Sequence, residues 1–243
     1  MTTTVLPAFD AKLLSARDEA AGVRTFRFAS PARYSFIPGQ FMMFRFNDDP
    51  KTWRAYSVCS SPRNAADWFE VTVGMVGAFS ERLGKLSPGG EGGLAARGPF
   101  GLWTYDGSPA HAVLVSGGTG ITPFRAMCRL KMDGARAGRL TVCYSAKSPD
   151  DLIYRDEYGA WRRAEIAVHP RITRALGAEG SWTGLTGRWT PDELIKTADD
   201  PDAIYYLCGS NKMVSELREG LQARGVRPER VRTEKWGDYA DLI

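Results

Sequence analysis

Two short segments in the first half of the chain carry residue types that could bind a phosphorylated ligand with a flat ring. Arg54-Ala55-Tyr56-Ser57 ends a strand-like stretch. Its arginine can hold a phosphate, its tyrosine can stack on a ring and its serine can donate a hydrogen bond. Twenty residues later, Gly77-Ala78-Phe79-Ser80 opens a predicted helix, whose first N–H groups suit a pyrophosphate. The alternatives are a solvated strand and an ordinary serine N-cap.

A third segment, in the second half, is rich in glycine: Ser116-Gly117-Gly118-Thr119-Gly120-Ile121-Thr122-Pro123. It follows a predicted buried strand and opens a predicted helix. Glycines let a backbone approach a phosphate closely, and the helix start supplies partial positive charge. No lysine follows as in a triphosphate-hydrolysing P-loop, and Pro123 stands where GxGxxG has its third glycine.

The elements that must carry these segments differ between the two halves of the chain. Before Tyr105, short strand-like runs recur at Val23–Phe28, Gln40–Phe46 and Trp68–Val73, which is typical of a small antiparallel barrel. One helix is predicted over Ser80–Leu86, with Ser80 as its N-cap.

After Ser108 the pattern changes to alternating strands and helices, which predicts a parallel sheet with helices on both faces. We therefore expect two domains, residues 1–105 and 106–243. The predicted strands are Ala112–Val115, Leu140–Tyr144, Ile166–Val168, Ala203–Leu207 and Val231–Lys235. The predicted helices are Pro123–Met132, Asp156–Arg162, Pro191–Thr197 with Thr190 as its N-cap, and Lys212–Arg224.

Composition excludes several classes of protein. The chain has 243 residues, 43% apolar and 25% charged, as in globular proteins and unlike disordered chains. A balance of 32 Lys+Arg against 28 Asp+Glu lacks the dense positive charge of a nucleic-acid binder. Four scattered cysteines and two isolated histidines offer no metal-ligand spacing, so no metal site is expected. Without an apparent signal peptide or an apolar run of about 20 residues, we expect a cytoplasmic protein.

The order of these motifs resembles the ferredoxin–NADP reductase superfamily from about Ala8 to Trp236. The flavin-domain motifs are Pro38-Gly39-Gln40-Phe41, Arg54-x-Tyr56-Ser57, Gly77-x-x-Ser80, Pro88-Gly89 and Gly98-Pro99-Phe100-Gly101. The resemblance implies FAD lying across a six-stranded antiparallel barrel. Arg54 would pair with the pyrophosphate, Tyr56 would stack on the isoalloxazine and Ser57 would hydrogen-bond near the reactive N5. Ala55 and the segment Gly77, Ala78, Phe79 and Ser80 would complete the flavin site.

The same resemblance implies that the glycine-rich segment binds NADPH or NADH through Gly118, Thr119, Gly120, Thr122 and Pro123. Cys208 and Gly209 would lie beside the nicotinamide, although a buried cysteine can also be a small hydrophobe. Thr173 and Arg174 would contact the 2′-phosphate, which favours NADPH, although Arg174 can also be a surface residue.

Glu234 would lie near N5, and Trp236 would stack on the flavin, unless Trp236 is a packing residue and Tyr239 takes that role. The expected catalytic residues are Ser57, Cys208 and Glu234.

The implied enzyme passes hydride from NAD(P)H to FAD and then electrons to a separate acceptor. We expect a monomer whose acceptor is ferredoxin or flavodoxin. The alternatives are an oxygenase reductase component, an NADH-dependent flavin reductase, and a non-enzymatic flavin-binding sensory or electron-transfer module. The sequence leaves open the acceptor, the nucleotide preference, the direction of electron flow and the oligomeric state.

Overall fold

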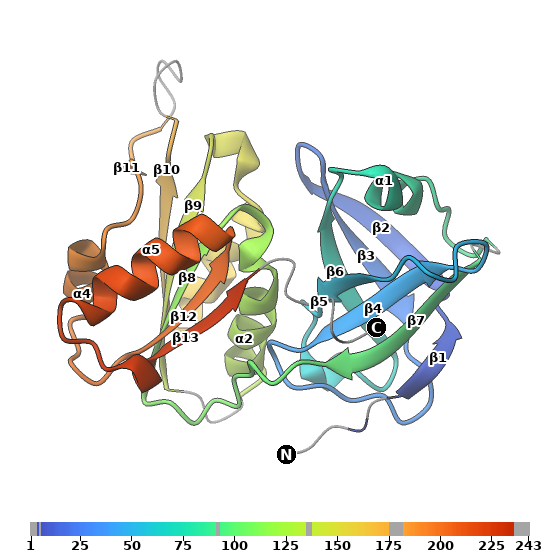
Figure 1. The fold of residues 1–243 in the computed structure, drawn as a ribbon, viewed down its shortest axis with the longest axis horizontal. Coiled ribbons are helices and arrows are strands. Elements are labelled where there is room, and N and C mark those ends of the chain that lie inside the picture. The colour runs from blue at the N-terminus through green and yellow to red at the C-terminus, as the bar shows by residue number, and fades with distance from the viewer. Residues whose placement is uncertain (1–3, 5, 91–92, 135–137, 175–181, 236–243) are drawn as a thin grey trace. The chain divides into compact units, whose positions relative to one another are not determined.

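The computed structural model describes residues 4, 6–90, 93–134, 138–174 and 182–235. The chain forms two compact units (Figure 1). The first contains the described residues up to 106 together with residues 122–133, and the second contains residues 107–121 and the described residues between 134 and 235. Contacts thus group the helix after the glycine-rich segment with the first unit, although that helix follows the boundary expected from sequence.

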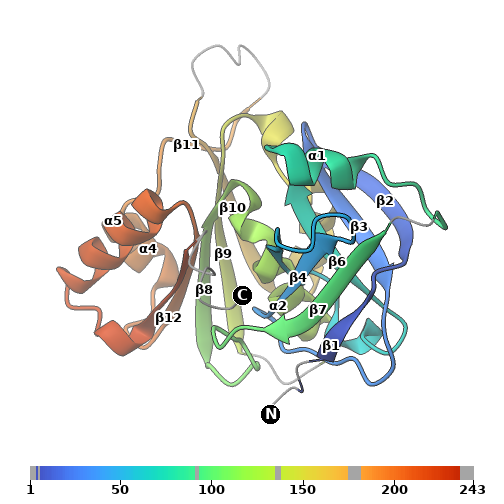
Figure 2. The same cartoon turned by 45° about the vertical axis from the view of Figure 1, so that its right-hand side comes forward.

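The first unit is built from antiparallel strands in two sheets, with strand orders β1-β7-β4-β5 and β2-β3-β6 (Figure 2). Only Ala11 and Lys12 separate β1 from β2, so the chain passes from one sheet to the other within two residues. A bridge between Val58 and Val71 links the two sheets. The strands are β1 (Leu6–Asp10), β2 (Leu13–Ala20), β3 (Val23–Ala29), β4 (Phe41–Phe46), β5 (Arg54–Ser57), β6 (Trp68–Gly74) and β7 (Leu94–Phe100).

Aromatic side chains fill the core between these sheets. The ring of Phe28 on β3 lies 5.1 Å from that of Phe44 on β4 and 5.7 Å from that of Phe69 on β6. The strand period of two explains this packing, because alternate residues of β3 point to the same side. The opposite side of β6 carries Glu70 and Thr72, and both are also buried. Both faces of this strand are therefore covered, which alternation alone does not predict.

Helix α1 (Ala78–Gly84) differs at its start from the sequence prediction. Its N-cap is Gly77, in extended conformation, and not Ser80. Ser80 lies in the first turn, where its hydroxyl accepts the N–H groups of Val76 and Gly77, both at 3.1 Å. The serine satisfies backbone donors at the helix start from inside the helix, which sequence spacing does not distinguish from a cap.

Helix α2 (Thr122–Met132) packs within the first unit. Ala126 belongs to the apolar core of that unit. The ring of Phe124 lies 5.9 Å from that of Trp103, which follows β7. Nearly all of the first two turns is buried, including the charged Arg125.

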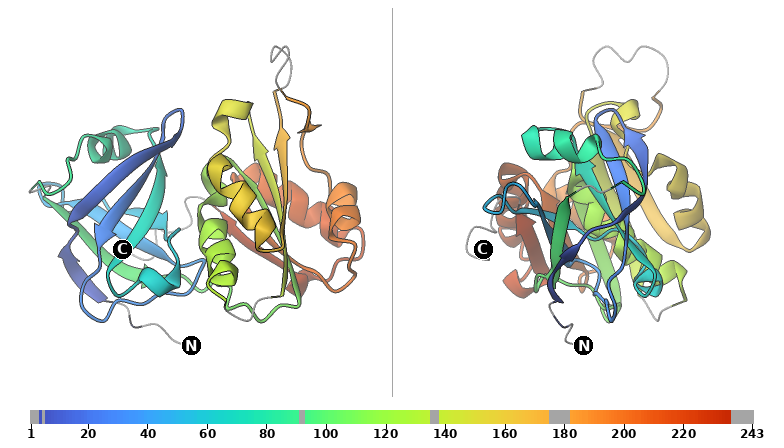
Figure 3. Two further views of the ribbon diagram at one scale, coloured as in Figure 1. Left: turned by 180° about the vertical axis from the view of Figure 1, so that it is seen from behind. Right: turned by 90° about the vertical axis from the view of Figure 1, so that its right-hand side faces the viewer.

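The second unit has a six-stranded sheet, ordered β11-β10-β9-β8-β12-β13, in which every neighbouring pair is parallel. Its strands are β8 (His111–Gly117), β9 (Arg139–Ala146), β10 (Ile166–Ile172), β11 (Leu185–Thr186), β12 (Ile204–Gly209) and β13 (Val231–Lys235). The helices α4 (Pro191–Ala198) and α5 (Asn211–Gln222) cover one face (Figure 1). Helix α3 (Tyr158–Arg163) covers the other (Figure 3).

The predicted order of strands and helices in this unit is confirmed, and the differences are local. Thr190 caps α4 as expected, its hydroxyl accepting the N–H of Glu193. A short 3-10 helix at Arg155–Glu157 delays α3 to Tyr158. The two-residue strand β11 was not predicted, because Leu185 and Thr186 are too few to show a period. No helix in the described part of the chain has the length and apolar character needed to span a bilayer.

Candidate functional site

The two flavin-type motifs of the first unit lie together. Tyr56 on β5 packs with its ring centroid 6.2 Å from that of Phe79 in the first turn of α1, and 6.0 Å from that of Phe44. Burial raises the pKa of Tyr56 to about 12, so its phenol stays protonated at neutral pH. The end of β5 and the start of α1 therefore form one surface.

This surface has room and charge for an anionic, aromatic ligand. Arg54 is exposed, and its Nη1 donates to the carbonyl of Trp53 at 2.9 Å. A side chain added at Gly77 would meet no atom within 4 Å, and the adjacent Val76 is 92% exposed. An open backbone at a helix start, an exposed guanidinium and a half-buried tyrosine fit a flavin dinucleotide. Ala55 and Ser57 complete β5 and are both partly exposed.

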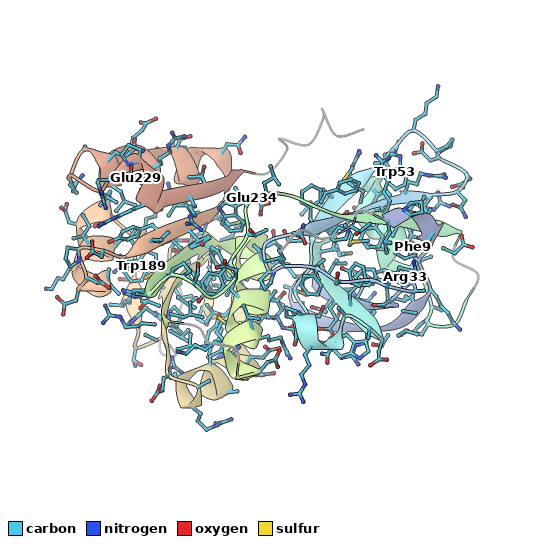
Figure 4. All side chains as sticks on the ribbon, turned by 90° about the horizontal axis from the view of Figure 1, so that it is seen from below. Phe9, Arg33, Trp53, Trp189, Glu229 and Glu234 are labelled. Carbon is cyan, nitrogen blue, oxygen red and sulfur yellow. The ribbon has the colours of Figure 1, made fainter. Side chains whose placement is uncertain are left out.

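One feature beside this surface was missed from sequence. The ring of Trp53, immediately before Arg54, lies 4.4 Å from the guanidinium carbon of Arg97 and 5.2 Å from that of Arg45 (Trp53 is labelled in Figure 4). Both arginines stack on the indole and so fix its orientation. No short-range signal predicts this group, because its three residues come from different strands. Arg45 lies on β4, Arg97 lies on β7, and Trp53 directly precedes β5.

In the second unit the glycine-rich turn touches the end of β12. After β8, residues Gly118–Ile121 form a short 3-10 turn that leads into α2 at Thr122 and Pro123. A Cβ on Gly120 would lie 2.3 Å from the carbonyl oxygen of Cys208, so only glycine fits there. Gly118 adopts φ +55°, and a Cβ there would meet nothing within 4 Å. The turn thus combines a tight packing contact at Gly120 with open backbone at Gly118, which fits a phosphate of a nucleotide.

Cys208 and Glu234 lie side by side on neighbouring parallel strands. They are direct partners in the register of β12 and β13, and the Cys208 thiol donates to Glu234 Oε2 across 3.8 Å (Glu234 is labelled in Figure 4). Burial, and secondarily the charge of Glu234, raises the pKa of Cys208 well above its ordinary value. The thiol therefore remains protonated, which excludes thiolate chemistry at neutral pH.

The pair expected to read the 2′-phosphate lies just beyond β10. Thr173 donates through its N–H and its hydroxyl to the carbonyl of Ala146, at 2.9 and 3.1 Å. The Arg174 N–H donates to the carbonyl of Lys147 at 3.0 Å. The side chains of Arg174 and Lys147 are both exposed past the carboxyl ends of neighbouring strands, where parallel sheets bind ligands. Lys147 was missed, although a cation directly after a predicted strand is a usable signal.

The remaining expectations fall on the C-terminal segment. Trp236 and Tyr239, the two candidates for stacking on the flavin, lie outside the described residues.

Cys208 and Gly209 stand next to the glycine-rich turn, and Glu234 stands next to Cys208. Thr173 and Arg174 follow β10, which is separated from β8 by β9. The nucleotide-type residues of the second unit therefore gather at the carboxyl edge of its sheet.

Comparison with known proteins agrees with both groups of residues. Residues 10–105 match the family model described as an oxidoreductase FAD-binding domain, and residues 114–219 match an oxidoreductase NAD-binding domain. Ferredoxin–NADP reductase B of Sorangium cellulosum is 34% identical over 241 residues, covering 94% of this chain and 97% of that protein. The glycine betaine monooxygenase reductase subunit of Pseudomonas aeruginosa is 32% identical over 229 residues, covering 90% of this chain and 62% of that subunit.

A solved structure shares the fold. The crystal structure of a ferredoxin NADP+ reductase from Neisseria gonorrhoeae, with FAD and NADP bound, superposes with a TM-score of 0.78 at 23% identity and covers 94% of this chain and 98% of that one. Motifs, fold and relatives agree on a protein that binds FAD in its first unit and a nicotinamide nucleotide in its second. This chain is an FAD-dependent NAD(P)H oxidoreductase and belongs to the ferredoxin–NADP reductase superfamily.

Proposed function

We propose that this oxidoreductase takes hydride from NADPH and delivers the electrons to a separate carrier protein, ferredoxin or flavodoxin. The observation that carries the proposal is the buried Cys208–Glu234 pair, in which the backbone of Cys208 lies directly against Gly120 of the nucleotide turn. When bound, FAD supplies the change from two-electron to one-electron chemistry. The protein's own groups bind the two cofactors, orient them and exclude water.

In the first unit, we assign the pyrophosphate of FAD to Arg54 and the flavin ring to Tyr56, with Phe79 supporting the tyrosine from behind. Ser57 donates a hydrogen bond to the ring and Ala55 contacts it through the backbone. The exposed guanidinium and the half-buried phenol support this assignment. Because the Ser80 hydroxyl already bonds to the backbone of Val76 and Gly77, the contact from Gly77–Ser80 comes from the backbone N–H groups that follow Gly77.

We assign the phosphates of the nucleotide to the glycine-rich turn and the start of α2, Gly118–Pro123, and the 2′-phosphate to Thr173 and Arg174. The exposed Lys147, one strand end away, adds positive charge for that phosphate. A guanidinium fork matches a phosphate in geometry, so the proposal favours NADPH over NADH.

Beside the nicotinamide, Cys208 and Gly209 shape the pocket. The protonated thiol fills space and donates to Glu234, which keeps that carboxylate oriented. Glu234 then holds charge near the site of hydride transfer. Trp236 remains our proposal for the residue that stacks on the flavin.

Ferredoxin or flavodoxin is preferred as acceptor because the relative matched along nearly its full length is a ferredoxin–NADP reductase. An oxygenase component is the second candidate, because a monooxygenase reductase subunit is 32% identical, although the chain spans only 62% of it. We propose a monomer in the cytoplasm, where the four buried cysteines, none of which forms a disulfide, would remain thiols.

The deciding experiment is an anaerobic visible spectrum of the purified protein, before and after adding NADPH or NADH. We expect a flavin spectrum that NADPH bleaches faster than NADH does. The reduced protein is then mixed with ferredoxin, flavodoxin, free flavin and an oxygenase component in separate runs. Reoxidation by free flavin alone would contradict a protein acceptor, and a yellow protein that neither nucleotide bleaches would contradict the enzyme.

A matched pair of variants tests the roles beside the nicotinamide. Cys208→Ala should slow bleaching at saturating NADPH by about 10²-fold, because the ring loses its lateral support. Cys143→Ala is the control, since Cys143 is equally buried but belongs to the core cluster that includes α4 and α5 residues. Equal rates for the two variants would refute the assignment of Cys208.

A further inference from the structure

A single buried carboxylate in the first unit is shared by three arginines. Glu70 on β6 accepts at Oε1 from Arg17 Nη1 at 3.0 Å, and from Arg27 Nε and Nη2 at 3.1 and 2.9 Å. Its Oε2 accepts from Arg125 Nη1 at 2.6 Å. Arg17 and Arg27 come from β2 and β3, which belong to the same sheet as β6, whereas Arg125 comes from α2.

The three arginines are not equivalent. The side chains of Arg17 and Arg27 are 43% and 36% exposed, and each has a further partner: Glu19 for Arg17, and the ring of Trp68, 3.8 Å away, for Arg27. The Arg125 side chain is only 2% exposed, as is that of Glu70. Two charges this deep are tolerated because they neutralise each other, and removing one would leave the other uncompensated. The deep half of the cluster is therefore the Glu70–Arg125 pair.

The ionisation of Glu70 agrees with this description. Burial by itself would raise the pKa of the carboxyl, but the charge and hydrogen bond of Arg125, helped by Arg17 and Arg27, lower it to about 2. The carboxylate is thus charged throughout the physiological range and holds Arg125 permanently.

The same pair holds the chain just beyond the flavin motif. Arg125 Nη1 also donates to the carbonyl of Cys59, at 3.3 Å, and the Cys59 N–H donates to the carbonyl of Glu70, at 2.8 Å. Cys59 lies two residues after Ser57, the last residue of β5. Both backbone groups of Cys59 are therefore fixed by this one pair of residues.

Arg125 also lies in the first turn of α2, three residues after Thr122, where the glycine-rich turn ends. Apolar contacts of the helix, such as Phe124 on Trp103, stabilise its packing but fix its rotation weakly. A short ion pair in a defined geometry fixes the rotation of that turn, as buried polar groups can.

We propose that Glu70 and Arg125 are positioning residues for the nicotinamide nucleotide. Their ion pair fixes the first turn of α2 and thereby the backbone of Thr122 and Pro123, the proposed nucleotide-binding residues at the start of that helix. This rests on the proposed function, in which Gly118–Pro123 binds the phosphates. Neither residue touches the nucleotide, so the pair acts on its affinity only through the backbone of the helix.

The test separates stability from positioning. In the flavin-loaded protein, Glu70→Met should lower Tm by about 10 °C, because Arg125 is left without its carboxylate. The double variant Glu70→Met/Arg125→Met replaces both charges by apolar side chains and should recover most of that Tm. It should nevertheless bind NADP+ about 3- to 30-fold more weakly by calorimetry, with faster amide hydrogen exchange in α2.

Two further variants keep the result interpretable. Arg125→Lys keeps the charge but loses the fixed geometry, so it should also weaken NADP+ binding. It provides the test if the double variant does not fold. Arg27→Met is the control: it removes a partner of Glu70 on β3 and should leave NADP+ affinity unchanged. Wild-type affinity and exchange in the double variant, or in Arg125→Lys, would overturn the inference. A wild-type protein that binds no nicotinamide nucleotide would overturn the proposed function and this inference with it.

Discussion

Replacing Gly120 by alanine tests the close approach between the glycine-rich turn and β12. The added Cβ would lie 2.3 Å from the carbonyl oxygen of Cys208 and 2.8 Å from its carbonyl carbon, whereas ordinary contact begins at 3.4 Å. Both atoms belong to the backbone of a central strand, so they cannot rotate away as a side chain could. The turn itself must therefore move by about 1 Å.

That displacement sets the expected magnitudes. Overpacking of this kind costs about 1–3 kcal/mol, which corresponds to a fall in Tm of roughly 2–12 °C for a chain of this size. A shift of about 1 Å in a positioning element lowers kcat/KM by about 10²-fold. We expect this loss with NADPH and with NADH alike, because we propose that the turn containing Gly120 binds the phosphates common to both nucleotides, whereas the 2′-phosphate is assigned to Thr173 and Arg174.

The assay compares Gly120→Ala with Gly159→Ala in nucleotide-dependent flavin reduction, flavin content and thermal unfolding. Gly159 lies in α3, where the nearest atom to an added Cβ is Nη1 of Arg163 at 3.6 Å. Alanine there should leave kcat/KM unchanged and should raise stability by about 0.5–1 kcal/mol. Wild-type kcat/KM and Tm in Gly120→Ala would refute the packing argument, and loss of flavin would refute a fault confined to the nucleotide turn.

Three other predictions concern single residues. Tyr56→Ser should release flavin during purification while Tyr56→Phe retains it, because the ring carries the stacking contact; normal flavin content in Tyr56→Ser would contradict this. Arg174→Ala should raise the KM for NADPH about 10- to 100-fold, from 1.5–3 kcal/mol for a charge-assisted phosphate contact. It should leave the KM for NADH nearly unchanged, and equal effects would argue against the 2′-phosphate role. Burial, with the charge of Arg139 nearby, lowers the pKa of His111 below 6.5. The unfolded chain then binds a proton first, so stability falls below about pH 6.5, and His111→Gln should flatten the dependence of Tm over about pH 5 to 8. A variant with the wild-type profile would assign the acid sensitivity to other groups.

Much of the fold follows from local pattern. The alternation in Val23–Phe28 predicts the strand β3, and the aromatic and β-branched residues of Trp68–Val73 predict β6. Thr190, followed by Pro191 and a helical period, predicts the start of α4. The residue pattern fails to predict the structure where two different backbone arrangements suit the same residues. Ser80 near a helix start can cap it from outside or satisfy its donors from within, and only the backbone path distinguishes these.

For the candidate site, the sequence by itself determined the residue types and their family pattern: an arginine and a tyrosine at a strand end, and glycines between a strand and a helix. These are short-range features, because they depend on the backbone freedom and chemistry of adjacent residues. Tertiary structure decided which groups meet. Cys208 and Glu234 are 26 residues apart and became neighbours only through the order of parallel strands.

The Glu70–Arg125 pair gives the strongest contrast. Alternation in β6 predicts that Glu70 faces water, opposite the buried Phe69. In the structure both are buried, because Arg125, 55 residues away, and the neighbouring arginines cover and neutralise the carboxylate. The sequence determines which face of a strand is polar. Whether that face stays in water depends on a partner brought from far along the chain, since a buried charge is stable only where an opposite charge meets it.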